Sequence, residues 1–174
     1  MREEEKKRID LIFKVYGLAM VSPMEILTSN RLYPQNIEYF KENATMEMIN
    51  NLESLVYKLH KIRHKLKIPF VITSGFRTPE QNAKVGGATN SNHCLCKAVD
   101  IRDQTGEIDG WFLNNQALLE EYDLSLESPR YTSHWCHIQL GTPKSKKRVF
   151  KPYSREPLPH ERDYMYDSLK KLGL

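Results

Sequence analysis

The pattern of apolar positions is most regular in the first half of the chain. Apolar residues recur at helical spacing over residues 8–16, and again in a long stripe that begins after Thr45 and ends near residue 67. Thr45 is a residue type that caps helices, and Pro69 disfavours helical backbone just before it. We therefore predict two amphipathic helices, with an irregular segment over residues 21–40, where two prolines act as breakers.

Short apolar runs separated by helical segments fill the rest of the chain. Three strands are predicted from runs of apolar, β-branched or aromatic residues at 70–73, 98–101 and 135–140. Three further helices are predicted, a short one that begins at Pro79 and two over residues 110–122 and 163–172. This order predicts an α+β domain with a small sheet and flanking helices.

Length and composition fit one globular domain. The chain has 174 residues, of which 40% are hydrophobic and 28% are charged, and a chain of this size can bury a core without disulfides. We predict a single domain with an N-terminal helix over residues 1–20, a core over 21–142, and a basic strip with a C-terminal helix over 143–174. No apolar stretch approaches the roughly 18 residues that span a membrane, and the acidic N-terminus lacks the apolar region of a secretory signal. We therefore expect a protein made in the cytoplasm without a signal peptide.

The net charge of +4 is concentrated in one segment. Residues 141–155 contain no acid and six cations, namely Lys144, Lys146, Lys147, Arg148, Lys151 and Arg155. Such a basic strip either is a solvated tail or binds an anionic partner: a nucleic acid, a membrane surface or an anionic wall polymer. No nucleic-acid recognition motif accompanies it, so we do not expect a nucleic-acid partner.

Some of the six histidines lie where they could bind a metal ion. His93 follows a turn-rich segment, Asp100 lies in the predicted strand after it, and His137 lies on another strand. Seven residues of helix would hold His93 and Asp100 about 10 Å apart, so only a loop that folds back before the strand would let them share an ion. Two histidines and a carboxylate are the ligands of a catalytic zinc site with an open fourth position. By contrast, His60 and His64 lie on a charged helix face and are predicted to be solvated.

Four motifs follow one another along residues 72–139. The chain has Ser-Gly-Phe-Arg-Thr at 74–78, Val-Gly-Gly at 85–87, Ser-Asn-His through Ala-Val-Asp at 91–100, and Trp-Cys-His-Ile at 135–138. Together these motifs resemble those of the VanY-like D-alanyl-D-alanine carboxypeptidases, a family of zinc peptidases that shares its fold with hedgehog signalling domains. The resemblance implies a hedgehog/DD-peptidase-like fold with a mostly antiparallel sheet.

The resemblance also implies roles for individual residues. His93, Asp100 and His137 match the ligands of one zinc ion per chain. Arg77 matches the arginine that faces the substrate and stabilises the negative charge that develops on the scissile carbonyl. Ser91 matches a serine that helps to hold the substrate terminus.

The chain departs from the family pattern at two places. Cys96 replaces a glycine, although glycine adopts a positive φ more readily. Cys94 and Cys96 either compete for the metal or are small buried residues. The acid usually found a few positions before the last ligand is also missing. We expect the general base to be Glu127, returned to the metal by an extended loop over residues 128–133, or else His134, which could also assist as a proton donor. The remaining alternative is a chain without a base.

The favoured interpretation is a zinc-dependent hydrolase that cleaves amide bonds in peptidoglycan stem peptides, as a D-Ala-D-Ala carboxypeptidase or an endopeptidase. The wall polymer is anionic, which suits the basic strip, and a phage-type lysin would reach the wall without a signal peptide. One alternative is a non-catalytic zinc-binding or phage structural module of the same fold. Another is a cysteine hydrolase that uses one of the three cysteines with His134 or His137.

Overall fold

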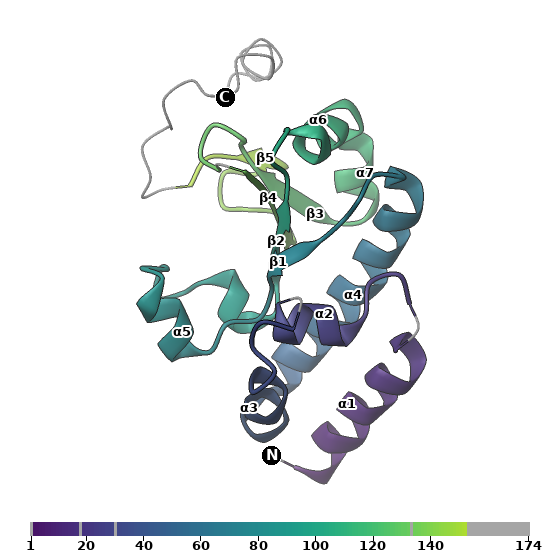
Figure 1. The fold of residues 1–174 in the computed structure, drawn as a ribbon, viewed down its shortest axis with the longest axis vertical. Coiled ribbons are helices and arrows are strands. Elements are labelled where there is room, and N and C mark those ends of the chain that lie inside the picture. The colour runs from purple at the N-terminus through teal and green to yellow at the C-terminus, as the bar shows by residue number, and fades with distance from the viewer. Residues whose placement is uncertain (1, 18, 30, 133, 153–174) are drawn as a thin grey trace. The chain divides into compact units, whose positions relative to one another are not determined.

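The computed structural model describes residues 2–17, 19–29, 31–132 and 134–152. Its contacts group into two compact units, Met1–Val99 and Asp100–Leu174. The first, unit 1, contains most of the helices, and the second, unit 2, contains most of the strands (Figure 1). This mixture confirms the predicted α+β class.

Unit 1 is built around one long helix, α4 (Met46–Leu66). The Thr45 hydroxyl accepts a hydrogen bond from the Met48 amide at its start, and Lys67, in the left-handed conformation, ends it. Eight side chains along α4 are buried, as the apolar stripe predicted. Helices α1 (Glu3–Tyr16) and α2 (Pro23–Thr28) pack against α4, and α1 runs alongside it in Figure 1.

The remaining elements of unit 1 are short. They are α3 (Asn36–Asn43), β1 (Ile72–Ser74), α5 (Pro79–Lys84) and the 3₁₀ turn η1 (Asn92–Leu95). Helix α5 begins where the sequence predicted, with Thr78 as its cap and Pro79 in its first turn. No helix among the described residues is long and apolar enough to cross a membrane.

The prediction of an irregular segment over residues 21–40 is wrong, because α2 and the start of α3 lie there. Ser22 and Glu25 form a capping box, in which the Ser22 hydroxyl accepts from the Glu25 amide and the Ser22 amide donates to the Glu25 carboxylate, both at 3.3 Å. Pro23 occupies the first turn of α2, where its fixed φ suits a helix and its missing N–H costs nothing. This proline therefore starts a helix instead of breaking one.

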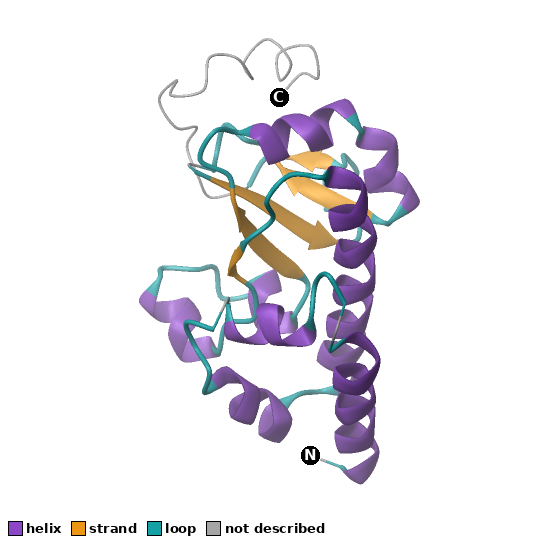
Figure 2. Ribbon diagram, turned by 45° about the vertical axis from the view of Figure 1, so that its right-hand side comes forward, coloured by secondary structure: helices purple, strands orange, loops and turns teal. Residues whose placement is uncertain are grey.

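Unit 2 contains a long antiparallel hairpin. Strand β3 (Leu124–Glu127) pairs with β4 (Trp135–Leu140), with Leu126 opposite Ile138. On its other side β3 pairs in parallel with β5 (Val149–Phe150). The strand order is β1-β2-β4-β3-β5, and β2 (Ala98–Arg102) contains the boundary between the units. The strands are orange in Figure 2.

Unit 2 has two strands that were not predicted, and two helices where one was predicted. Strand β3 is Leu-Ser-Leu-Glu, which is too short and too polar to predict burial, yet all four residues are buried. Strand β5 has only two residues. The helix predicted over 110–122 is divided at Asn115 into α6 (Glu107–Asn114) and α7 (Gln116–Glu121). The helix predicted over 163–172 lies outside the described residues.

Candidate metal centre

His93 is fixed at both its backbone and its ring. It lies in η1, where the Ser91 hydroxyl accepts a hydrogen bond from the His93 amide at 3.3 Å. Its ring atom Nδ1 lies 2.8 Å from the Gly75 carbonyl oxygen. Because a carbonyl oxygen can only accept, Nδ1 carries the proton, and Nε2 is the nitrogen that could bind a metal ion.

The Gly75 carbonyl is itself fixed by close packing against α2. A Cβ atom at position 75 would lie 2.1 Å from the Ile26 carbonyl oxygen, so only glycine fits. The Gly75 amide donates to the Ser29 hydroxyl at 3.0 Å, and the Phe76 amide donates to the Ile26 carbonyl at 2.8 Å. The glycine of the Ser-Gly-Phe-Arg motif therefore positions the acceptor that orients the His93 ring.

Asp100 and His137 form a close, nearly buried pair. Asp100 lies on β2 and His137 on β4, and each side chain is 12% exposed. His137 Nδ1 lies 2.7 Å from Asp100 Oδ1. Burial alone would lower the pKa of His137, but the hydrogen bond and charge of Asp100 outweigh burial and raise that pKa above its usual value. The charge of Glu127 raises it further.

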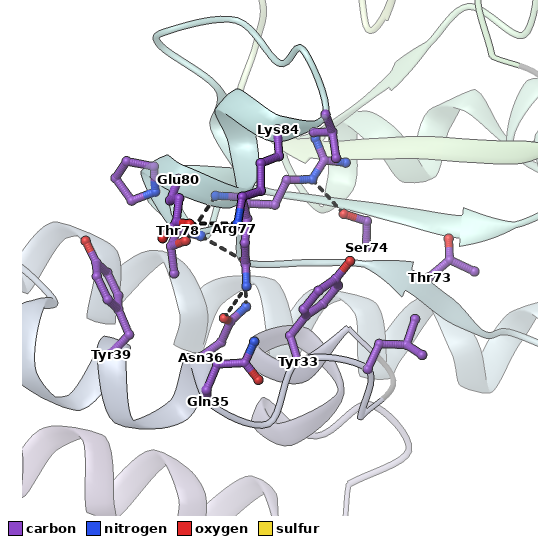
Figure 3. Close-up of a pocket in the computed structure, with 14 residues that line it drawn as sticks. Tyr33, Gln35, Asn36, Tyr39, Thr73, Ser74, Arg77, Thr78, Glu80 and Lys84 are labelled. Atoms are coloured by element: carbon purple, nitrogen blue, oxygen red, sulfur yellow. Dashed lines mark hydrogen bonds and ion pairs between the residues drawn. The ribbon is translucent and has the colours of Figure 1, made fainter.

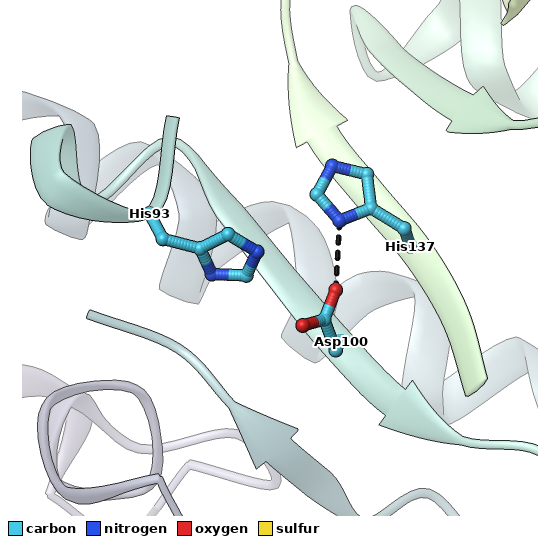
Figure 4. Close-up of side chains that lie close together, drawn as sticks. All are labelled: His93, Asp100 and His137. Carbon is cyan, nitrogen blue, oxygen red and sulfur yellow. Dashed lines mark hydrogen bonds and ion pairs between the residues drawn. The ribbon is translucent and has the colours of Figure 1, made fainter. Parts of the chain in front are cut away.

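The three predicted ligands lie together. His93, Asp100 and His137 each offer one ligand atom, and these atoms all lie within 4.8 Å of one another (Figure 4). Two imidazole nitrogens and one carboxylate oxygen fit zinc with an open fourth position, and the outer contact to Gly75 is of the kind that orients zinc-bound histidines. No cysteine belongs to this group among the residues that the structure describes.

Glu127 lies next to His137, but strand pairing places it there and not the predicted loop over residues 128–133. It is the last residue of β3 and is 7% exposed. The printed register pairs Leu126 with Ile138, so its continuation by one residue places Glu127 opposite His137. Residues directly opposite on an antiparallel pair have side chains on one face of the sheet. Strand pairing, rather than a returning loop, therefore places this carboxylate opposite the candidate ligand His137.

His134 has a different environment. It is exposed, its backbone is left-handed with φ of 64°, and it precedes β4 instead of belonging to it. Its carbonyl oxygen accepts a hydrogen bond from the Asp103 amide at 2.9 Å. Its proposed role as base or proton donor stays a prediction.

Arg77 is held within unit 1. Its Nε donates to the Ser74 hydroxyl at 2.8 Å, and its backbone amide donates to the His93 carbonyl at 3.3 Å. Arg77 is also one of the residues that line a cavity in unit 1. Ser91 lies two residues before His93, and its hydroxyl serves the local turn.

A model of the Peptidase M15 family matches residues 27–138, more than half of the chain. The chain belongs to the peptidase M15 family. This family comprises VanY-like zinc peptidases that act on peptidoglycan-type substrates, which confirms the family that the sequence motifs indicated. The comparison with curated proteins gave no match.

The cysteines of this M15 peptidase lie beside the metal group but outside it. Cys96 has φ of 55° and is completely buried, which confirms that this position needs a left-handed backbone. Burial raises the pKa of Cys96 well above its usual value. Burial and then the charge of Asp109 do the same for Cys136. Both thiols therefore stay protonated at neutral pH, which argues against either as a nucleophile.

Proposed function

We propose that the chain is a zinc-dependent hydrolase that cleaves amide bonds in peptidoglycan stem peptides, as a D-Ala-D-Ala carboxypeptidase or an endopeptidase. The observation that carries this proposal is the group of His93, Asp100 and His137, whose ligand atoms lie within 4.8 Å of one another. The two histidines and the aspartate would hold the zinc ion. When bound, zinc supplies a Lewis acid and lowers the pKa of the water that it binds.

Glu127 is the general base in this proposal. Glu127 on β3 and His137 on β4 lie opposite each other, with their side chains on the same face of the sheet. The charge of Glu127 raises the pKa of His137. A carboxylate oxygen of Glu127 would accept the proton of the attacking water and later donate it to the leaving amine. Burial keeps bulk water away from this carboxylate.

Arg77 is the electrostatic partner of the substrate. A guanidinium carries five N–H donors in a fixed planar geometry, and the Nε donor of Arg77 is held by the Ser74 hydroxyl at 2.8 Å. The guanidinium would donate hydrogen bonds to the oxygen on which negative charge develops in the transition state. Ser91 would help to hold the terminus of the substrate.

The proposal is tested with Glu127→Gln, which keeps the shape of the side chain and removes its basicity. We expect wild-type protein with one zinc per chain to release a defined muropeptide fragment from purified peptidoglycan, identified by mass spectrometry, which names the bond. We expect Glu127→Gln to lose about 100-fold or more in rate while it keeps its zinc. Glu121→Gln is the matched control, because Glu121 is exposed at the end of α7.

Two outcomes would contradict parts of this proposal. Full activity of Glu127→Gln would remove Glu127 as the base, and His134→Ala would then be the variant to measure. Zinc binding without hydrolysis of any wall preparation would favour the non-catalytic module instead.

We also propose that the basic strip binds the anionic wall polymer. Lys144, Lys146, Lys147 and Lys151 are exposed, whereas Arg148 forms ion pairs with Glu120 at 3.1 Å and Asp123 at 2.7 Å. The lysines therefore supply the binding charge of the strip, and Arg148 serves the fold of unit 2. Arg155 lies outside the described residues.

A further inference from the structure

A large cavity lies in unit 1 beside the segment that carries Arg77. Its volume is about 750 Å³, and residues from α3, β1, α5 and the turn before α3 line it (Figure 3). Cavities of this size accommodate a ligand of a few residues or a drug-sized molecule.

The floor of the cavity is rigid because its amide groups are paired with each other. The Gln81 side chain donates to Asn36 Oδ1 at 2.7 Å, and Asn36 Nδ2 donates to Gln81 Oε1 at 3.0 Å and to the Phe76 carbonyl at 3.3 Å. Asn36 is completely buried. Gln81 also closes the capping box of α5 with Thr78. This network fixes the cavity before any ligand arrives.

Several of the residues that line the cavity are apolar and exposed. Leu32, Tyr33 and Val85 are 68%, 41% and 62% exposed, and all three line it. In Figure 3 the rings of Tyr33 and Tyr39 stand on either side of Asn36. Exposed apolar side chains that gather around a single cavity, with polar groups beside them, mark a contact surface for a ligand.

The charges around the cavity leave an excess of one positive charge. Its charged lining residues are Arg77, Lys84 and Glu80. Lys84 forms an ion pair with Glu80 at 2.7 Å, with side chains 71% and 76% exposed. An exposed pair of this kind is weak, so an anionic ligand can draw the lysine away from Glu80. The ligand that fits is therefore an anion that also carries small apolar groups.

The cavity adjoins the turn that carries the first metal ligand. The Arg77 amide donates to the His93 carbonyl, so the cavity wall and η1 are bonded within the same unit. A substrate with its scissile bond near His93 would extend into this space. A stem peptide has both required properties, since it carries a free carboxylate on its glutamyl residue and the methyl groups of alanine.

We propose that this cavity binds the acidic, uncleaved part of the stem peptide, with Tyr33 and Lys84 as specificity-determining residues. The inference rests on the proposed function and names the part of the substrate that the chain recognises. Tyr33 packs against the small side chains of the peptide, and Lys84 pairs with its carboxylate.

Binding by the whole chain, in chelator so that no turnover occurs, tests this inference. The probe is the tripeptide N-acetyl-L-alanyl-γ-D-glutamyl-L-lysine, an anion, titrated by calorimetry. Its D-isoglutamine analogue lacks the carboxylate of the glutamyl residue. We expect Tyr33→Ala to weaken tripeptide binding about tenfold and Lys84→Ala about threefold. Glu80→Gln should tighten binding, because it removes the opposing charge. Lys84→Ala should leave binding of the isoglutamine analogue unchanged.

Tyr57 and Lys61 provide matched controls in the same unit. Tyr57 is 46% exposed, Lys61 lies over its ring at 5.6 Å, and neither lines the cavity. We expect Tyr57→Ala and Lys61→Ala to bind the tripeptide like the wild type. Equal binding by Tyr33→Ala, Lys84→Ala and wild type would overturn the inference, as would no binding of the tripeptide. Tyr33-dependent binding of neutral chitotetraose in place of the tripeptide would also overturn it and assign the cavity to the glycan.

Failure of this inference and failure of the proposed function give different results. Suppose that the wild type hydrolyses the wall, but the Tyr33, Lys84 and Glu80 variants bind the tripeptide as tightly as the wild type does. The cavity assignment is then wrong, and the proposed hydrolase function is retained. If tripeptide binding follows the expected pattern but zinc-loaded protein cleaves no wall preparation, the proposed hydrolase function is wrong and the proposed peptide-binding cavity is retained.

Discussion

Gly75 shows how a residue without a side chain can orient a candidate metal ligand. Its carbonyl orients the His93 ring, and the carbonyl stays in place because the backbone passes against Ile26 without room for a Cβ atom. A Gly75→Ala substitution must therefore shift α2 or β1.

We expect Gly75→Ala to destabilise the fold by about 2 kcal/mol and to weaken zinc binding, because the acceptor of His93 moves. Denaturant unfolding and a zinc titration measure the two effects. Gly110→Ala is the control, since a Cβ there meets nothing within 4 Å in the middle of α6, where alanine is a better helix former. Equal unfolding midpoints for the two variants would contradict the role of Gly75.

The three cysteines differ in their accessibility to reagents. Cys96 and Cys136 are completely buried with raised pKa values, whereas Cys94 is half-buried, with a pKa that burial raises and the charge of Arg77 lowers. Iodoacetamide at neutral pH should label Cys94 slowly in the folded chain and leave the other two unmodified, because the thiolate is the reactive form. Mass spectrometry of the intact protein measures this, with denatured protein as the fully labelled control. Rapid labelling of Cys136 would show that β4 is less buried than described here.

The sequence predicted which residues form the candidate site better than it predicted how the fold brings them together. The candidate ligands His93, Asp100 and His137 came from the resemblance to the VanY-like family, because their spacing alone is a weak signal. The positive φ of Cys96 followed from the glycine that it replaces. Glu127 was predicted to approach the metal, but by a loop. The sequence Leu-Ser-Leu-Glu has too little pattern to reveal a strand, so the pairing that brings Glu127 to His137 could not be predicted.

At the scale of elements, the short helix α2 was not predicted, whereas the equally short α5 was predicted from its cap and proline. Helix α2 has only six residues, and its proline lies in the first turn, where the same residue type can start or break a helix. Helix α4 was predicted well because its apolar stripe extends over 21 residues. A long segment with periodic apolar residues can be predicted as a helix from its own sequence. The formation of a short element depends more on contacts with residues far away in the chain.

Helix α5 provides a test at this scale, because its cap also supports the cavity. Thr78→Ala removes the hydroxyl that accepts from the Gln81 amide at 3.2 Å, and we expect a loss of about 1 kcal/mol of stability. We also expect weaker tripeptide binding, because Gln81 is part of the cavity floor. Thr45→Ala removes the equivalent cap of α4 and should cost a similar free energy of unfolding without changing tripeptide binding. Calorimetry and denaturant unfolding on both variants measure the difference.

For the whole molecule, the uneven distribution of charge underlies the proposed binding to the cell wall. We expect replacement of Lys144, Lys146 and Lys147 by alanine to reduce binding to purified cell walls and to flatten its dependence on salt, because surface charges act through screened electrostatics. Hydrolysis of a small soluble muropeptide should stay unchanged. Co-sedimentation at several salt concentrations measures the first effect. The control is replacement of Lys6, Lys7 and Lys14 on α1, which removes the same charge elsewhere. If both triple variants lost wall binding equally, binding would depend on the net charge of the protein and not on the position of the basic strip.

The positions of the ligands along the chain have a consequence for biosynthesis. His93 and Asp100 are translated close together, whereas His137 follows 37 residues after Asp100 and comes into place only when β4 has formed. A nascent or truncated chain that ends before β4 has two of the three ligands and cannot complete the site. Under the proposed function, capture of the metal therefore requires a folded hairpin, and we expect a chain cut between β3 and β4 to lose zinc before it loses its long helix.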